Sequence, residues 1–259
     1  MSVRGHQARG PHGRSGDRRW VGTFTSHRAV SGRRSRRARW YYGSGRSSGR
    51  ALLEEKRYTE FADRLRAAGF VQDQNEKGNP TRQRWKFGEE GNLAIDFLIQ
   101  PTRSGDRGGH LRHIEDDFAA IIVPGLHLAF EDRTRVTLSD ETIKGARATR
   151  DIWVCGAGAY VVLKALAFRG RGENKDAYDL YYVVSSFGSG PADVAAALRP
   201  LMHDGDAREA LTVLKTDFLD LDGLGARGVA EFLTGGTSDD VQADVVGYVG
   251  DLVRLVEEE

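Results

Sequence analysis

The sequence predicts an α+β fold, in which a mixed sheet with flanking helices is followed by a helical C-terminal lobe. Up to about residue 155, short runs that alternate polar and apolar side chains are separated by glycines, which is typical of strands and turns. Beyond that point apolar side chains recur at helical spacing. We therefore divide the 259 residues into a basic segment 1–50, an α/β lobe 51–155 and a helical lobe 156–259.

The first elements of the α/β lobe are a helix and a hairpin. Residues 57–68 form an amphipathic stretch that ends at Gly69, so a helix is expected there. The run 84–87 alternates polar and apolar side chains, and the run 93–99 is rich in strand formers. The glycines and glutamates between these two runs favour a turn, so together they predict a β-hairpin.

The middle of the chain is expected to hold a loop and short strands. The loop covers 105–109, and His110 and His113 follow it. These histidines have metal-ligand spacing only in a helix, so with the acidic run 115–117 behind them we expect a solvated loop and a helix start. Short strands are expected at 126–130, 136–138 and 152–154. The last one leads through Gly156-Ala-Gly158 into a helix, a type of turn that can hold phosphate.

The helical lobe begins with two helices joined by a tight turn. The first is centred on Lys164, the one cation of an apolar stretch. In the second, apolar side chains occupy one face, and Asp176 and Asp179 lie at its border. Asn174 is the expected N-cap and Gly188 the expected stop. Four more helices are expected at 194–202, 207–214, 229–233 and 241–256.

Lys164 and the two aspartates allow two interpretations. An Asp in the first turn of a helix is stabilised by the helix dipole, and a half-buried Asp beside a Lys or Arg is commonly a structural ion pair. Active sites use the same arrangement of a cation and carboxylates against a core. On composition alone, the structural interpretation is the stronger one.

Two motifs in this region resemble a known family. The pattern Lys-x-x-Ala-x-x-x-Arg at Lys164, Ala167 and Arg171 is followed by Lys-Asp-x-x-Asp at 175–179. In this order, and joined by one tight turn, they resemble the downstream motifs of the AbiEii/MenA-like nucleotidyltransferase toxins. These toxins are associated with abortive phage infection and type IV toxin–antitoxin systems. The similarity extends from about Phe61 to the C-terminus.

The resemblance implies a nucleotidyltransferase-like sheet and an enzyme that transfers a nucleotide from an NTP to an acceptor such as tRNA or a protein. Mg²⁺ is the implied cofactor, because carboxylate-bound Mg²⁺ bridges the phosphates in this kind of reaction. A cognate antitoxin is an implied partner.

The resemblance also implies roles for particular residues. Asp96, in the apolar run 93–99, would be the metal ligand or would activate the acceptor hydroxyl, and an unpaired carboxylate there would cost on the order of several kcal/mol to bury. Lys164 would stabilise charge on the phosphates, and Asp176 would orient Lys164 or act as a base. These three catalytic residues are expected to share one cleft. The residues expected to bind nucleotide are Lys164, Arg169, Arg171, Lys175 and Asp179.

The upstream carboxylates of such a site are missing. The family places Gly-Gly or Gly-Ser before a short helix and then Asp-x-Asp on a strand, and no such arrangement precedes Asp96. An Asp-x-Asp at Asp220 and Asp222 lies in turn-like sequence before Gly223, so we expect a loop there rather than a metal site.

Residues 1–50 differ from the rest of the chain. They contain thirteen arginines, no lysine and one acidic residue, a net charge of +12, whereas the remainder has a net charge of −11. With so few apolar side chains we expect this segment to be disordered. One interpretation is a basic arm that binds nucleic acid. The other, favoured by the absence of lysine, is out-of-frame translation, since a one-base shift over 30–46 permits Gly-Gly followed by Asp-x-Asp.

The remaining composition points to a cytoplasmic protein. Cys155 is the one cysteine, so the sequence contains no disulfide framework, which fits a reducing compartment. At the end of a predicted strand it is expected to be a core residue. No apolar run approaches the ~20 residues needed to span a bilayer, so no membrane association is expected.

Two functions are therefore considered. The first is a nucleotidyltransferase toxin. The second is a catalytically inactive remnant that binds nucleotide, RNA or a partner protein without turnover.

We expect the chain as it stands to show little or no nucleotidyl transfer. Without the Asp-x-Asp pair, Mg²⁺ would have only Asp96, and the lost electrostatic stabilisation corresponds to at least about a thousandfold in rate. A version carrying the one-base-shifted segment should regain transfer of labelled NTP to tRNA and cause growth arrest on induction. Equal activity of the two versions would contradict this and would assign the metal to other carboxylates, such as Asp176 and Asp179.

Overall fold

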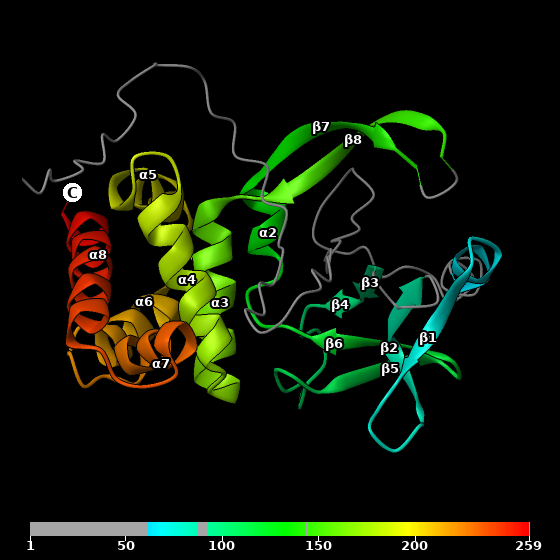
Figure 1. The fold of residues 1–259 in the computed structure, drawn as a ribbon, viewed down its shortest axis with the longest axis horizontal. Coiled ribbons are helices and arrows are strands. Elements are labelled where there is room, and N and C mark those ends of the chain that lie inside the picture. The colour runs from blue at the N-terminus through cyan, green and yellow to red at the C-terminus, as the bar shows by residue number, and fades with distance from the viewer. Residues whose placement is uncertain (1–61, 88–92, 143–144, 259) are drawn as a thin grey trace, which may run out of the picture.

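The computed structural model describes residues 62–87, 93–142 and 145–258. The segment 1–50, with both of its interpretations, and the turn between the two hairpin runs lie outside the described residues. The fold is α+β, as predicted: small sheets make up the first part and helices the second (Figure 1). None of the described helices combines the length and the apolar character that a membrane span requires.

The first sheet contains the predicted hairpin, but the run 93–99 is split, because its last two residues pair with another sheet. The strand order of the first sheet is β1-β2-β3, and its strands are β1 (Phe70–Gln74), β2 (Pro80–Phe87) and β3 (Leu93–Asp96). Strands β2 and β3 pair antiparallel in a register that sets Arg84 opposite Asp96 and Phe87 opposite Leu93. Trp85 is almost fully buried in a small core beneath this sheet. Residues 62–67 are helical and precede Gly69, whose φ of 88° is the left-handed conformation expected of a helix stop.

A second sheet and a ribbon complete this part of the chain. The sheet has the order β4-β6-β5, with strands β4 (Leu98–Ile99), β5 (Leu111–Glu115) and β6 (Phe118–Ile122). The ribbon pairs β7 (Arg133–Glu141) with β8 (Arg147–Cys155) and extends away from the helices (Figure 1). Its two strands contain the predicted strands 136–138 and 152–154 but are longer, because their ladder continues through polar pairs such as Ser139 and Thr149.

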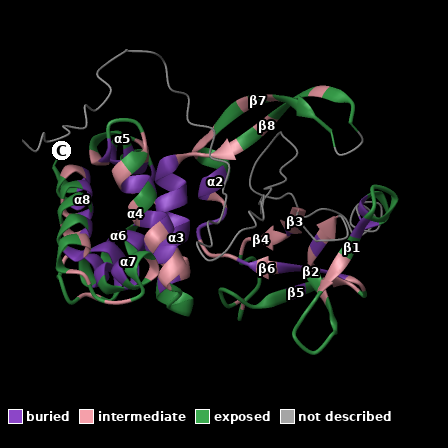
Figure 2. Ribbon diagram, in the orientation of Figure 1, coloured by how far each residue is buried: buried purple, intermediate pink, exposed green. Residues whose placement is uncertain are grey.

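Seven helical elements form the C-terminal lobe. They are α3 (Ala157–Arg171), α4 (Asn174–Ser186), α5 (Pro191–Leu198), the 3-10 turn η1 (Arg199–Leu201), α6 (Gly205–Phe218), α7 (Leu224–Thr234) and α8 (Asp239–Glu257). All the helices predicted beyond 156 are present. Helix α3 is the central one: it packs against α4, α5 and α6 and is buried along most of its length (Figure 2).

A short helix replaces one predicted strand. Residues 126–130 do not form a strand, because Gly125 turns the chain at a φ of 73° and α2 (Leu128–Glu131) follows. Leu128 and Ala129 are buried in the helical core. An apolar run this short is compatible with the periodicity of a strand and with that of a helix. The packing of this segment against α3 therefore decided its conformation.

Two other expectations near turns were wrong. The acidic run 115–117 does not start a helix: residues 116 and 117 form the turn between β5 and β6, and His113 lies in β5. The antiparallel pairing of β5 with β6, which sets Leu111 opposite Ile121, holds this stretch as two strands joined by a turn rather than as a helix. At α4 the N-cap is Glu173 rather than Asn174. The expected stop at Gly188 is confirmed, because this glycine directly follows the C-cap Phe187 with a φ of 58°. The loop expected at 220–222 is confirmed.

Gly158 is required where α3 crosses α5. A Cβ at this position would lie 2.4 Å from the carbonyl oxygen of Ala197, whereas a Cβ at Gly170 of the same helix would meet nothing within 4 Å. Gly158→Ala should lower the free energy of unfolding by about 1–3 kcal/mol, because backbone must shift to admit the methyl group. Gly170→Ala is the matched control and should raise it by up to about 1 kcal/mol through helix propensity. Urea unfolding measures both, and equal stability of the two variants would refute the close approach.

Candidate functional site

Lys164 joins α3 to α4 as the sequence motifs predicted. Its side chain is nearly buried, and its Nζ donates to Asp176 Oδ1 at 2.9 Å and to Asp179 Oδ2 at 2.7 Å. Both aspartates are on α4, which follows α3 after a turn at Gly172 with a φ of 67°. The structure therefore brings two of the three predicted catalytic residues, Lys164 and Asp176, into direct contact.

Asp176 is the most buried charge of the site, with 1% of its surface exposed. Besides Lys164, it holds the guanidinium of Arg171 through two bonds, Nε to Oδ2 at 2.5 Å and Nη2 to Oδ1 at 2.8 Å. Burial raises the pKa of Asp176, but the hydrogen bonds from Arg171 and the charge of Lys164 outweigh burial and hold the pKa below its ordinary value. The carboxylate is therefore ionised at neutral pH.

Asp179 completes the cluster with Lys175. The ammonium of Lys175 lies 2.8 Å from Oδ1 and 2.6 Å from Oδ2 of Asp179, one helical turn away on α4. Three cations thus surround two carboxylates, and we call Lys164, Arg171, Lys175, Asp176 and Asp179 the Lys164 cluster. The side chains of Arg171 and Lys175 are 51% and 39% exposed, so the face that the cluster turns to solvent is cationic.

Arg169 was expected beside Arg171 and lies elsewhere. Its Nε is 3.6 Å from Asp217 Oδ2 on α6. Two residues along a helix rotate the side chain by about 200°, so Arg169 and Arg171 leave α3 on different sides. The prediction that Arg169 or Arg171 contacts the triphosphate is untested, and of the two the structure brings Arg171 into the Lys164 cluster.

Asp96 belongs to a separate pair. It is 8% exposed on β3, and both of its oxygens accept from Arg84 on β2, Oδ1 from Nε at 2.5 Å and Oδ2 from Nη2 at 3.0 Å. The polar partners of Lys164 are Asp176 and Asp179, both in the helical lobe. No hydrogen bond or ion pair within the described ranges joins Asp96 to Lys164, so the shared cleft remains a prediction.

The glycine turn before α3 already holds an anion from the chain itself. Asp132 Oδ2 accepts from the backbone N–H of Ala159 at 2.9 Å, and a Cβ on Gly156 would lie 1.8 Å from Asp132 Oδ1. A carboxylate therefore fills the position where this turn could hold phosphate. Burial, together with the charge of Asp132, raises the pKa of the Cys155 thiol to about 12. Cys155 is partly buried and packs against the helical core, and its raised pKa keeps the thiol protonated at neutral pH.

Asp96, the expected Mg²⁺ ligand, does not fit that ion in this arrangement, and neither do Asp176 and Asp179, the alternative carboxylates. Arg84 occupies both oxygens of Asp96, and the cations of the Lys164 cluster occupy both oxygens of Asp176 and of Asp179. The positive charge of the Arg and Lys side chains beside these carboxylates repels a hard divalent cation. The exposed guanidinium and ammonium groups of Arg171 and Lys175 give this arrangement the charge that would attract an anion.

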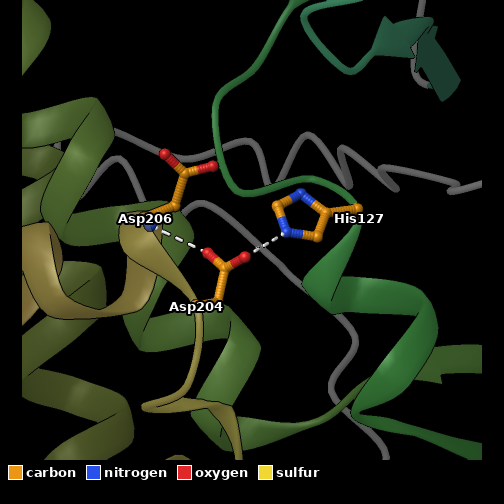
Figure 3. Close-up of side chains that lie close together, drawn as sticks. All are labelled: His127, Asp204 and Asp206. Atoms are coloured by element: carbon orange, nitrogen blue, oxygen red, sulfur yellow. Dashed lines mark hydrogen bonds and ion pairs between the residues drawn. The ribbon is translucent and has the colours of Figure 1, made fainter.

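One group of potential metal ligands was not predicted from the sequence. His127, Asp204 and Asp206 place ligand atoms within 4.8 Å of one another where α2 meets the start of α6 (Figure 3). The available signal was Asp204-Gly-Asp206, which is an Asp-x-Asp pattern like the one at 220–222. The histidine could not have been found from spacing, because 77 residues separate it from Asp204.

Comparisons of the chain with protein-family models, with curated proteins and with solved structures found no match.

The ionised carboxylate of Asp176 should make the free energy of unfolding fall as the pH is lowered into the acidic range. Its pKa in the folded chain lies below the ordinary value of 3.8, so its contribution is complete above about pH 3.8 and declines as the pH falls toward the folded-state pKa. Asp176→Asn leaves Lys164 and Arg171 without this partner and should cost about 3–5 kcal/mol at neutral pH. Its deficit relative to the unaltered chain should shrink below pH 3.8.

Urea unfolding at several pH values between 7 and 3 measures this difference. Asp251→Asn, on the exposed surface of α8, controls for the simple loss of a carboxylate. A deficit of the Asp176 variant that stays constant down to pH 3 would show that its ionisation does not stabilise the fold.

Proposed function

We propose that this chain is a nucleotidyltransferase-type protein, of the toxin class that its motifs resemble, and that it binds the phosphates of an NTP at the Lys164 cluster. Three cations meet there on two carboxylates, and the guanidinium and ammonium of Arg171 and Lys175 reach solvent. That cationic face is the observation on which the proposal rests. The proposed acceptor is RNA such as tRNA, the proposed compartment is the cytoplasm, and a cognate antitoxin is the proposed partner.

The cluster suits phosphate because its cations are fixed in place. Arg171 is held in a bidentate geometry by Asp176, so its guanidinium loses little freedom when it meets a second planar or tetrahedral anion. Lys164 lies beneath it, held by two aspartates. Of the two roles considered for Asp176, orienting the cations is the better supported, because both of its oxygens are occupied and its pKa is lowered.

Binding without turnover is the second candidate. It is favoured by the engagement of Asp96 with Arg84, because the positive charge of the guanidinium disfavours a metal ion at this carboxylate. In that case the chain binds nucleotide, RNA or a partner protein through the same cationic face but transfers nothing.

Removal of the exposed cations should weaken nucleotide binding. Arg171→Ala should raise the Kd for an NTP about tenfold to a hundredfold, since a hydrogen bond to a charged group contributes roughly 1.5–3 kcal/mol. Lys175→Ala should act in the same direction. Arg254→Ala, an equally exposed cation on α8, is the matched control and should leave binding unchanged. Equilibrium dialysis with each of the four NTPs provides the measurement, and unaltered binding by both cluster variants would refute the proposed site.

Transfer assays separate the two candidates. The full chain is incubated with radiolabelled NTP, Mg²⁺ and total tRNA, and labelled RNA is resolved on a gel. Label that disappears with Asp96→Ala and with Lys164→Ala supports the enzyme. Nucleotide binding that depends on Arg171 without any labelled product supports binding without turnover.

A further inference from the structure

A second group of titratable side chains lies outside the Lys164 cluster, where α2 meets the start of α6. His127 immediately precedes α2, and Asp204 and Asp206 flank the first residue of α6. The three side chains face a common space, with the imidazole on one side and the two carboxylates on the other (Figure 3). We propose that His127, Asp204 and Asp206 bind one divalent transition-metal ion, such as Zn²⁺ or Mn²⁺. The proposal does not rest on the proposed function.

The geometry suits a small ion. Each residue offers one ligand atom, and the three atoms lie within 4.8 Å of one another. Ligands at about 2.0–2.2 Å from a metal are separated by roughly 3–4.4 Å, so a minor closing of the side chains completes the site. All three residues are half-buried, which shields an ion while leaving it a path from solvent.

The donor set indicates the class of metal. An imidazole nitrogen with carboxylate oxygens is typical of Zn²⁺, Mn²⁺ and related ions, whereas Mg²⁺ and Ca²⁺ favour oxygen ligands alone. Unlike the aspartates of the Lys164 cluster, these two carboxylates have no Lys or Arg partner among the described residues. In the part of the chain that the structure describes, His127 is the one ion-pair partner of these carboxylates, and it carries positive charge only when it is protonated.

The carboxylates are oriented by the backbone. Asp204 Oδ1 accepts from the N–H of Asp206 at 2.8 Å as the N-cap of α6, while its Oδ2 faces His127 Nε2 at 2.9 Å. Asp206 Oδ2 accepts from the N–H of Gly125 at 2.7 Å, across 81 residues of sequence. Hydrogen bonds of this kind fix ligand orientation around bound metals and leave carboxylate lone pairs free.

The junction contains more donors of the same type. His203 Nε2 and Glu131 Oε2, at 3.7 Å, form a second histidine–carboxylate pair between the same two elements. An ion held by His127 from one side and by two aspartates from the other ties α2 to α6. Its binding should therefore raise the stability of the folded chain in proportion to the logarithm of metal concentration.

The test uses the full chain after treatment with a chelator. Zn²⁺, Mn²⁺ and Mg²⁺ are each titrated by calorimetry, and Tm is measured at each metal concentration. We expect one Zn²⁺ per chain at this site, a Tm that rises with Zn²⁺, and a preference for Zn²⁺ and Mn²⁺ over Mg²⁺. Equal affinity for Mg²⁺ would overturn the assignment to a transition metal.

Two variants and a control locate the ion. His127→Gln and Asp206→Asn should each weaken Zn²⁺ binding at least about tenfold. Loss of a group that only supports a metal ligand already costs about that much in metal affinity. Asp204 is left intact because it caps α6. His110→Gln, at an exposed position of the α/β lobe, should bind as the unaltered chain does. Circular dichroism confirms that the variants are folded.

The Co²⁺-loaded chain adds a spectroscopic measurement, since its visible spectrum should change in His127→Gln. Zn²⁺ binding that persists unaltered in both His127→Gln and Asp206→Asn would place the ion elsewhere and overturn the proposal. The absence of any bound metal at micromolar concentration would overturn it as well.

Discussion

The burial of Asp176 between α3 and α4 is the constraint on which the rest of the site depends. An ionised carboxylate with 1% of its surface exposed is stable only if cations and hydrogen bonds replace the water it has lost. Lys164 supplies one cation from the middle of α3 and Arg171 supplies another from its last turn. The tight turn at Gly172 brings α4 back against α3 so that these contacts can form.

The same helix links the two parts of the chain. The core of the helical lobe is built around α3, whose approach to α5 leaves no room for a side chain at Gly158. Its N-terminus is capped by Asp132, which precedes the β7–β8 ribbon, so the carboxylate stabilises the helix dipole from outside the helix. The carboxylate of Asp132 also fills the glycine turn, so phosphate would have to displace it there.

The proposed anion site and the proposed metal site lie at different places in this molecule and use different carboxylates. The aspartates of the Lys164 cluster accept hydrogen bonds from Lys and Arg side chains. Asp96 likewise accepts from Arg84. Asp204 and Asp206 have backbone N–H groups and one histidine as partners, which leaves lone pairs for an ion. Under the proposed function, the chain keeps the cationic half of a nucleotide-transfer site, while the metal-binding carboxylates of the resembled family are missing from the sequence before Asp96. The resemblance to the toxin family rests on that half.

The sequence by itself determined the helices beyond residue 156, the hairpin of β2 and β3, and the pairing of Lys164 with Asp176 and Asp179. These features rest on periodicity and on contacts between neighbouring elements, which local spacing encodes. Only the tertiary structure decided that residues 126–130 form a turn and a helix, that Arg84 faces Asp96, and that Asp132 caps α3. It also placed His127 beside Asp204. Cross-strand register and contacts across 27 or 77 residues depend on how whole elements pack, and no short-range pattern in the chain specifies that packing.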